Sequence, residues 1–256
     1  MGRDVIIACD FSSKMKTLGF LACFRHIKPF IKIGMELYYK EGPSIVTELK
    51  EKGYKIFLDL KLHDIPNTVH KAMCNLSQLG VDMINCHASG GIQMMQAAVA
   101  GIKEGAKSAL PILIAVTQLT STSEEMLKKE LLIQSSLVDT VKHYAENALV
   151  AGINGVVCSP LEASIVKELG LLSVTPGIRF ADANDDDQKR IATPELAKAY
   201  GSDYIVVGRP ITNAANPVDA YNKCLEQFLD KDENVNKEIE QDQVCDADQE
   251  NQAEDD

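Results

Sequence analysis

Eight short apolar runs, separated by segments long enough for a helix, constrain the fold of this chain more than any other feature. Runs rich in Val and Ile without polar alternation are typical of strands buried on both faces, as in a parallel sheet. Parallel neighbours need a crossover connection, which is usually a helix, and the intervening segments have room for one. The runs are 5–10, 30–34, 55–61, 83–88, 112–117, 155–159, 172–177 and 204–209.

Helix-like periodicity fills several of the gaps, at residues 43–53, 68–80 and 193–201. The last two segments end at Gly80 and Gly201, and glycine is a common helix stop. Eight strand–helix units in a chain of 256 residues predict an α/β fold, a TIM (β/α)8 barrel of a single domain. A doubly wound nucleotide-binding sheet would prefer a GxGxxG sequence after the first strand, and ACDFSSK offers none.

The end of the chain differs in composition from the rest. Residues 230–256 contain twelve acidic residues and two lysines, and they carry −10 of the formal net charge of −11. Without aromatic residues or apolar periodicity, this segment buries too little surface to fold. We expect a barrel domain over residues 1–229 and a disordered acidic tail over residues 230–256. The near-neutral barrel domain lacks the basic patch of a nucleic-acid-binding protein.

Cysteine usage and hydropathy indicate a cytoplasmic protein. The seven cysteines are scattered, mostly in apolar runs and without a CxxC pair. This distribution favours core thiols in a reducing compartment over disulfides or a zinc site. No apolar run approaches the roughly 18 residues of a membrane span, and the N-terminus lacks the apolar stretch of a signal peptide. We therefore expect no membrane contact.

Polar residues at the carboxyl ends of the strands are candidates for a site, because a TIM barrel builds its site there. Polar residues elsewhere are mostly solvated surface. The candidates are Asp10, Lys32, Asp59 with Lys61, His87, Thr117 to Thr120, Ser159, Arg179 and Arg209.

The stretch KIFLDLKLHDIPNT places charges at the end of one apolar strand. Side chains alternate across a strand, so Asp59 and Lys61 should face the barrel mouth while Leu58 and Leu60 face the helices. The same alternation brings Lys32 to the site from the neighbouring strand. Charges rarely occur in an apolar strand unless they are paired or used. The spacing alone leaves open an ion-pair network that closes the barrel and a catalytic array.

The string DLKLHDIPNT resembles the signature of the orotidine 5'-monophosphate decarboxylases of the shorter bacterial type. ACDF, FIKIGMEL, HASGG, VTQLTS, VTPGIR, DQKR and VVGRPIT follow in that family's order, over nearly all of residues 1–229. The resemblance implies a carboxy-lyase that converts orotidine 5'-monophosphate to uridine 5'-monophosphate, the last step of de novo pyrimidine synthesis, without cofactor or metal. The acidic tail has no counterpart in the family.

The resemblance also implies roles for individual residues. Asp10 and Lys32 are expected at the ribose hydroxyls, and Lys32 also joins a charge array with Asp59, Lys61 and Asp64. Asp59 and Lys61 are expected to flank the carboxylate that is lost. Three residues are expected to enter the site from the other subunit of a homodimer: Asp64, Ile65 and Thr68.

Further residues are implied to hold the base and the phosphate. Thr120 matches a hydroxyl that reads the pyrimidine. Arg179 is expected near a phosphate-gripping loop, Gln188 on that loop and Arg209 on the phosphate itself. Gly208 permits close approach of the backbone, and Arg209 offers a bidentate fork.

These residue types suit the reaction that the resemblance implies. Loss of carbon dioxide from the orotate ring leaves an electron pair at carbon 6 that the π system cannot delocalise, and the sequence has no motif for a cofactor that would accept it. The ammonium of Lys61 can stabilise this charge and then donate a proton. Neighbouring carboxylates keep the lysines charged. A carboxylate of Asp59 beside the substrate carboxylate could also raise the ground state.

Two other functions stay open at this point. A magnesium-dependent sugar-phosphate decarboxylase or aldolase of the same wider group also carries a DxKxxD element. Such enzymes have an acidic metal ligand at the end of the second strand, where this chain has Lys32. A non-catalytic nucleotide-phosphate-binding protein would keep the fold without the chemistry, although every charged position needed here is present. His87, which precedes Gly90 and Gly91, is expected to orient a loop.

Overall fold

The structure, a computed structural model, describes residues 2–181 and 190–230, which form a closed barrel of eight parallel strands. The strands follow one another around the barrel in chain order, and β8 pairs with β1 to close it. The predicted TIM barrel is confirmed, with every strand within two residues of its predicted bounds or shortened at its carboxyl end. The strands are β1 (Asp4–Ala8), β2 (Phe30–Gly34), β3 (Ile56–Leu62), β4 (Met83–His87), β5 (Ile112–Val116), β6 (Gly155–Val157), β7 (Leu172–Thr175) and β8 (Tyr204–Val207).

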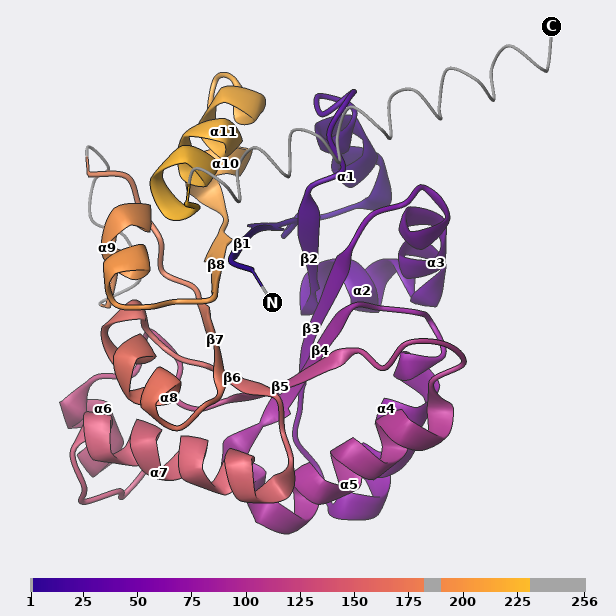
Figure 1. The fold of residues 1–256 in the computed structure, drawn as a ribbon. Coiled ribbons are helices and arrows are strands. Elements are labelled where there is room, and N and C mark those ends of the chain that lie inside the picture. Colours follow the sequence, from indigo (N-terminus) through magenta and orange to yellow (C-terminus); the bar gives the residue numbers. More distant parts are fainter. Residues whose placement is uncertain (1, 182–189, 231–256) are drawn as a thin grey trace, which may run out of the picture.

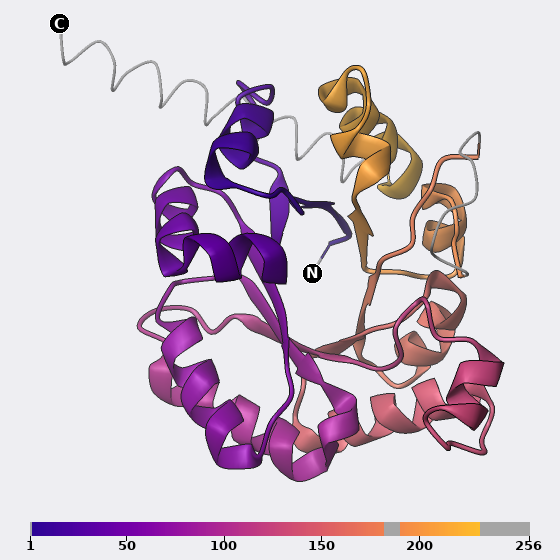
Figure 2. The same ribbon diagram turned by 180° about the vertical axis from the view of Figure 1, so that it is seen from behind.

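Helices surround the ring of strands, in chain order (Figure 1), and the view from behind shows the same ring (Figure 2). None of the helices in the described part of the chain is long and apolar enough to cross a membrane. The helices are α1 (Lys14–Leu21), α2 (Met35–Glu41), α3 (Pro43–Glu51), α4 (Pro66–Ser77), α5 (Gly91–Gly105), α6 (Glu124–Lys129), α7 (Leu137–Ala151), α8 (Ala163–Glu168), α9 (Pro194–Ala199), α10 (Arg209–Thr212) and α11 (Pro217–Phe228), with short 3-10 turns η1 (Ala88–Gly90) and η2 (Pro160–Glu162).

The predicted helical segments correspond to α3, α4 and α9. Helices α4 and α9 end two to three residues before Gly80 and Gly201, and both glycines have positive φ, 69° and 86°. Only glycine adopts this conformation without strain, so these residues turn the chain back toward the barrel. Pro66 occupies the first turn of α4, where its missing N–H costs nothing.

Side-chain alternation along the strands divides the core into two layers. The larger layer fills the space between strands and helices and includes Val5, Ile7, Leu58 and Leu60. The smaller layer lies inside the barrel: Ile6, Ala8, Phe30, Phe57, Met83, Ile114, Val174, Tyr204 and Val206. The leucines around Asp59 therefore face the helices, as the alternation predicts. A filled barrel interior leaves room for a ligand only at the mouth.

The described part of the chain extends one residue beyond the predicted domain boundary. Asp230 forms ion pairs of 2.8 Å with Arg3 and Lys198. This first residue of the predicted tail therefore contacts the barrel domain. The remainder of the predicted tail, residues 231–256, lies outside the described residues.

Candidate active site

A cavity of about 770 Å³ opens at the carboxyl ends of the strands, where this fold places its site. Apolar side chains from four strands form part of its wall: Phe57, Val116, Val157 and Val174. The cavity wall therefore combines charged side chains with an apolar surface. Eight of the predicted site residues line it: Asp10, Lys32, Asp59, Lys61, Thr120, Arg179, Gly208 and Arg209.

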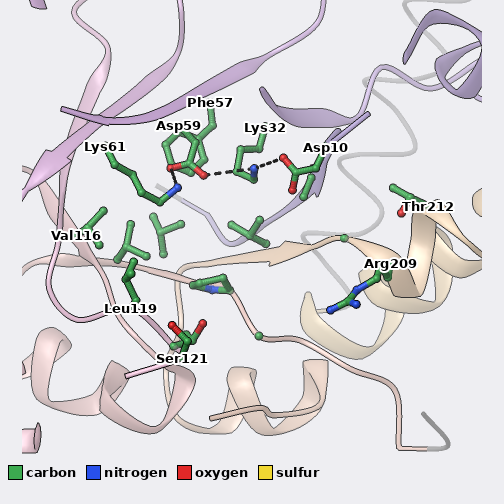
Figure 3. Close-up of a pocket in the computed structure, with 18 of the residues that line it drawn as sticks. Asp10, Lys32, Phe57, Asp59, Lys61, Val116, Leu119, Ser121, Arg209 and Thr212 are labelled. Carbon is green, nitrogen blue, oxygen red and sulfur yellow. Dashed lines mark hydrogen bonds and ion pairs between the residues drawn. The ribbon is translucent and has the colours of Figure 1, made fainter. Parts of the chain in front are cut away.

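Four of these residues form a row of alternating charges at the ends of β1, β2 and β3 (Figure 3). Lys32 Nζ lies 2.7 Å from Asp10 Oδ1 and 3.3 Å from Asp59 Oδ2. The other oxygen of Asp59 accepts a hydrogen bond from Lys61 Nζ at 2.7 Å. Each inner member of the row thus has an opposite charge on both sides, as the strand alternation predicts.

The two central residues of the row are buried. Lys32 is 8% exposed and Asp59 is 7% exposed. Burial alone would raise the pKa of Asp59, but Lys32 and Lys61 outweigh it and hold the pKa below its usual value. Burial likewise favours the neutral amine of Lys32, yet the carboxylates of Asp59 and Asp10 raise its pKa above the usual value. Both side chains are therefore ionised in a poorly solvated place.

The backbone of β3 departs from a regular strand at the catalytic candidate. Lys61 has a φ of 51°, and the register between β3 and β4 shifts between Leu58 and Leu62. A non-glycine residue in this region costs roughly 1–3 kcal/mol and persists only where its surroundings enforce the conformation. Asn85 on β4 provides that support, because its Oδ1 accepts from Lys61 N at 2.8 Å. Regular alternation predicts the side of Lys61 but not this irregularity.

Asn85 is a site residue that the sequence analysis missed. It is fully buried, and its Nδ2 donates to Asp59 Oδ1 at 2.7 Å while its Oδ1 holds the backbone of Lys61. One amide thus fixes both members of the Asp59–Lys61 pair. An asparagine inside the apolar run MINCH, an unusual place for a polar residue, is the signal that could have identified it.

The opposite end of the cavity is formed by loops after β7 and β8. Gly208 precedes α10 and Arg209 begins it. Arg209 is exposed, whereas Arg179 is buried and donates from Nη1 to the carbonyl oxygen of Ile178 at 2.8 Å. Figure 3 shows Arg209 across the cavity from Asp59 and Lys61. An anionic ligand group held by Arg209 would therefore lie apart from Asp59 and Lys61.

The loop after β5 forms another side of the cavity. Thr120 lines it as predicted, together with Gln118, Leu119 and Ser121. Gln118 is only 8% exposed, so the surrounding protein packs closely around it. The sequence analysis placed Gln118 only within a polar strand end, without a role for it.

Three of the predicted site residues that the structure describes do not line this cavity. Asp64, Ile65 and Thr68 are exposed, at the start of α4. Asp64 and Thr68 line a second, smaller cavity of about 320 Å³, and Lys61 borders both cavities. Gln188 falls within residues 182–189, outside the described residues.

His87 lies at the end of β4, next to the site but not on the wall of the main cavity. Its ring centroid lies 5.7 Å from that of His63. Burial, with His63 and Lys61 adding positive charge nearby, lowers the pKa of His87 to about 4. The ring is neutral at physiological pH, in keeping with the structural role expected for it. That role stays a prediction.

Ionised groups gathered in one cavity at the strand ends are the arrangement of TIM-barrel enzymes. The sequence profile described as "Orotidine 5'-phosphate decarboxylase / HUMPS family" matches residues 3–224. The chain is 53% identical over 233 residues to orotidine 5'-phosphate decarboxylases of Bacillus cereus and Bacillus mycoides, covering 89% of this chain and 98% of each relative. This chain belongs to the orotidine 5'-phosphate decarboxylase / HUMPS family.

Solved structures agree with this assignment. A crystal structure of orotidine 5'-phosphate decarboxylase from Lactobacillus acidophilus has a TM-score of 0.79 and 41% sequence identity, covering 88% of this chain and 99% of that one. A conserved protein of Geobacillus kaustophilus has a TM-score of 0.78 and 48% identity, with the same coverage. The likeness therefore extends over the whole barrel.

Proposed function

We propose that this chain decarboxylates orotidine 5'-monophosphate to uridine 5'-monophosphate without a cofactor, as the last step of de novo pyrimidine synthesis. The observation that carries the proposal is the row of alternating charges on the cavity wall, with Lys32 and Asp59 buried at its centre and Lys61 at one end. The names of its relatives support it, since proteins 53% identical to this chain are orotidine 5'-phosphate decarboxylases. The free thiols of the described residues are compatible with a cytoplasmic location.

In the proposed reaction, the bond between ring carbon 6 and the carboxylate breaks and the electron pair stays on carbon 6. The ammonium of Lys61 stabilises this localised charge, because a fixed cation in a poorly solvated cavity interacts more strongly than it would in water. Lys61 then donates a proton to carbon 6 and regains one from solvent. Asp59, 2.7 Å from Lys61, orients the ammonium group.

Asp59 has a second proposed role beside the substrate carboxylate. Because Lys32 and Lys61 hold its pKa below the usual value, Asp59 stays ionised and repels a neighbouring anion. The repulsion disappears when neutral carbon dioxide leaves, so it favours the transition state over the ground state. Lys32, between Asp10 and Asp59, offsets the negative charge of the row and reaches the ribose hydroxyls with Asp10.

The other predicted residues hold the rest of the nucleotide in this proposal. Thr120 reads the pyrimidine from the loop after β5. The phosphate occupies the end of the cavity near Arg179, with Gly208 allowing close backbone approach and Arg209 donating the charged hydrogen bonds. Gln188 is proposed to join them. The separation of Arg209 from Lys61 across the cavity supports a substrate with its anionic groups at two ends (Figure 3).

We also propose that two subunits share each active site. Asp64, Ile65 and Thr68 are exposed, and Ile65 keeps 66% of its surface accessible, so these side chains are available to a second subunit. Lys61 borders both the main cavity and the smaller one near Asp64, so the two cavities adjoin at this residue. A twofold pair would place Asp64 of each subunit beside the row of the other.

An ultraviolet assay of orotidine 5'-monophosphate loss, run with and without a chelator, tests the proposed activity. We expect equal turnover in both conditions, because the Nζ of Lys32 fills the place between Asp10 and Asp59 that a divalent cation would need. Turnover that requires magnesium, or turnover only of a sugar phosphate, would point to the other branch of the family. Binding of nucleotide without turnover would indicate a protein that has lost the chemistry.

A further inference from the structure

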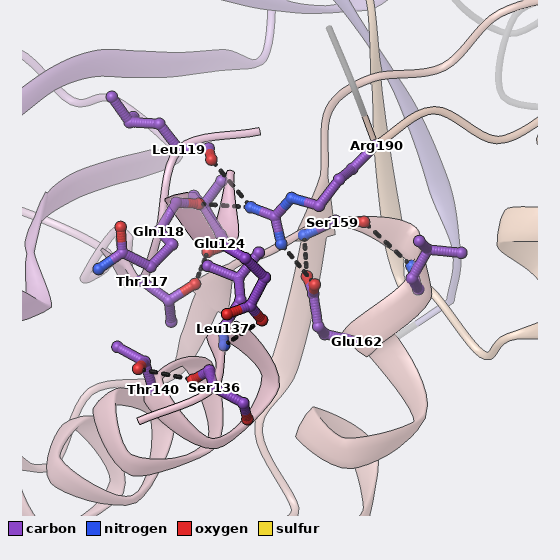
Figure 4. A network of polar contacts seen from close by, with 12 residues as sticks. Thr117, Gln118, Leu119, Glu124, Ser136, Leu137, Thr140, Ser159, Glu162 and Arg190 are labelled. Carbon is purple, nitrogen blue, oxygen red and sulfur yellow. Dashed lines mark hydrogen bonds and ion pairs between the residues drawn. The ribbon is translucent and has the colours of Figure 1, made fainter. Parts of the chain in front are cut away.

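A second buried ion pair joins the loops that follow β6 and β7 (Figure 4). Glu162 ends η2, and Arg190 lies between β7 and α9. Their side chains keep only 4% and 10% of their surface accessible. Arg190 Nη1 donates to Glu162 Oε1, and Glu162 Oε2 accepts from the backbone N of Ser159 at 2.7 Å. Removing two charges from water is costly unless both are well bonded, so this pair is more than an incidental surface contact.

The other arm of the same guanidinium reaches the loop between β5 and α6. Arg190 Nη2 donates to the carbonyl oxygen of Leu119 at 2.8 Å and lies 3.5 Å from that of Gln118. The Leu119 carbonyl also accepts from Thr122 N at 2.9 Å, which closes a turn at the same point. This loop delivers four residues to the cavity wall: Gln118, Leu119, Thr120 and Ser121.

We propose that Arg190 is a positioning residue for the nucleobase: held by Glu162, it fixes the backbone at Gln118 and Leu119 and thereby places Gln118 and Thr120 against the pyrimidine. The inference rests on the proposed function, which puts a pyrimidine at Thr120. Arginine suits this task because its planar fork donates from two nitrogens in different directions and stays charged. Arg190 does not line the cavity, so it acts through the loop and not by touching the ligand.

The contacts of Arg190 assign it to the base end and not to the phosphate end. Arg190 itself lies on the loop between β7 and α9, which also carries the proposed phosphate residue Arg179, but its partners on other loops follow β6 and β5: Glu162 and the carbonyls of Gln118 and Leu119. The proposed phosphate residue Arg209 follows β8. Loss of Arg190 should therefore weaken ligands that contain the base and spare ligands that contain only ribose and phosphate.

Calorimetric titration of the full chain with uridine 5'-monophosphate and with ribose 5-phosphate tests this selectivity. We expect Arg190→Ala to weaken uridine 5'-monophosphate about tenfold, the equivalent of one well-placed hydrogen bond, and to change ribose 5-phosphate less than about twofold. Arg209→Ala should weaken both ligands. Glu125→Gln is the matched control, because it makes an isosteric change in an exposed ion pair with Lys129 on the helix after the same loop. It should change neither affinity.

Glu162→Gln and Arg190→Lys keep the test decisive if Arg190→Ala does not fold. Glutamine removes the counter-charge, and one ammonium group cannot bond the carboxylate and the Leu119 carbonyl with the fork geometry of arginine. Both should show the same selectivity for the base, to a smaller extent. Equal weakening of the two ligands, or no weakening of uridine 5'-monophosphate, would overturn the proposal. A wild type that binds uridine 5'-monophosphate but does not decarboxylate would refute the proposed function and leave the positioning role standing.

Discussion

The two ends of the cavity differ in the secondary structure that carries their charged residues and in how deeply those residues are buried. At one end, Lys32 and Asp59 project from β2 and β3, are 8% and 7% exposed, and are paired on both sides. At the other end, Arg209 starts a four-residue helix after β8 and is exposed. Groups fixed on strands are positioned before the ligand arrives, whereas groups on loops can adjust to it.

This difference suggests a division of labour along the substrate. Fixed charges act where the electronic change occurs, because preorganised dipoles and ions need no rearrangement during the reaction. Adjustable groups at the far end supply binding energy from the part of the substrate that does not react. Changes in the charge row should therefore reduce the rate, and changes near Arg209 should reduce affinity.

Mixing two inactive variants gives the largest expected effect and tests whether the charge row is completed by a second subunit. Lys61→Ala and Asp64→Ala homodimers should each lose activity by at least about 1,000-fold. In a hybrid dimer, one site carries both defects and the other carries neither. Random exchange should thus restore about a quarter of wild-type activity. If subunit exchange is verified and no activity returns, Asp64 acts within its own chain.

Arg209→Ala tests the adjustable end. We expect kcat/KM for orotidine 5'-monophosphate to fall, with a rise of about 2–4 kcal/mol in the corresponding activation free energy, because charged hydrogen bonds to the phosphate are lost. Orotidine, which lacks the phosphate, serves as the control substrate and should be turned over by the variant as slowly as by the wild type. A similar loss on both substrates would show that Arg209 supports the structure instead.

Asn85→Ala sharpens the comparison at the fixed end. The change leaves Asp59 and the backbone of Lys61 without one buried partner each, so we expect a loss of about 1–3 kcal/mol in unfolding free energy and a roughly tenfold lower kcat. Denaturant titration and initial rates measure the two effects. Asn154→Ala is the matched control, because Asn154 Oδ1 accepts from Leu113 N at 2.9 Å at the opposite end of the barrel. An unchanged kcat in Asn85→Ala, as in the control, would contradict the positioning role.

His87 gives the smallest expected effect, on stability and not on rate. The pKa of His87 falls from 6.5 in the unfolded chain to about 4 in the folded chain. Between these two pH values, His87 is protonated more in the unfolded chain than in the folded one. The contribution is present above pH 6.5 and is lost as the pH falls toward 4. The slope is at most about 1.4 kcal/mol per pH unit and is smaller here because the ring is only half-buried. The melting temperature of His87→Asn should depend less on pH in this range than that of the wild type. If the two profiles are the same, His87 is not the cause of the pH dependence.

Sequence reasoning succeeded where a regular pattern of residues, such as side-chain alternation along a strand, determines the structure. The alternation around Asp59 predicts which side chains share the cavity, and apolar runs predict all eight strands. Position at the strand ends identified Thr120 and Arg209 as candidates, the family resemblance gave them roles, and both line the cavity. These assignments of residues to the substrate remain predictions.

The features that sequence reasoning missed depend on contacts between distant segments. Asn85 lies 24 residues from Lys61 along the chain but bonds its backbone, and the positive φ of Lys61 is enforced by that contact. The bond from Arg190 to the Leu119 carbonyl spans 71 residues. Neither interaction leaves a periodic pattern, because each concerns one side chain and one backbone group that the barrel brings together.

The central claim is that Lys61, at one end of the charge row, acts on the reacting carbon and neither holds the nucleotide nor merely closes the barrel. Measuring kcat and the affinity for uridine 5'-monophosphate together in Lys61→Ala tests it most directly, with Lys55→Ala, an exposed lysine just before β3, as the matched control. We predict that Lys61→Ala abolishes turnover, keeps the wild-type fold by circular dichroism and changes the affinity for uridine 5'-monophosphate less than about tenfold. Persistent turnover, or a loss of nucleotide affinity as large as the loss of rate, would contradict the claim.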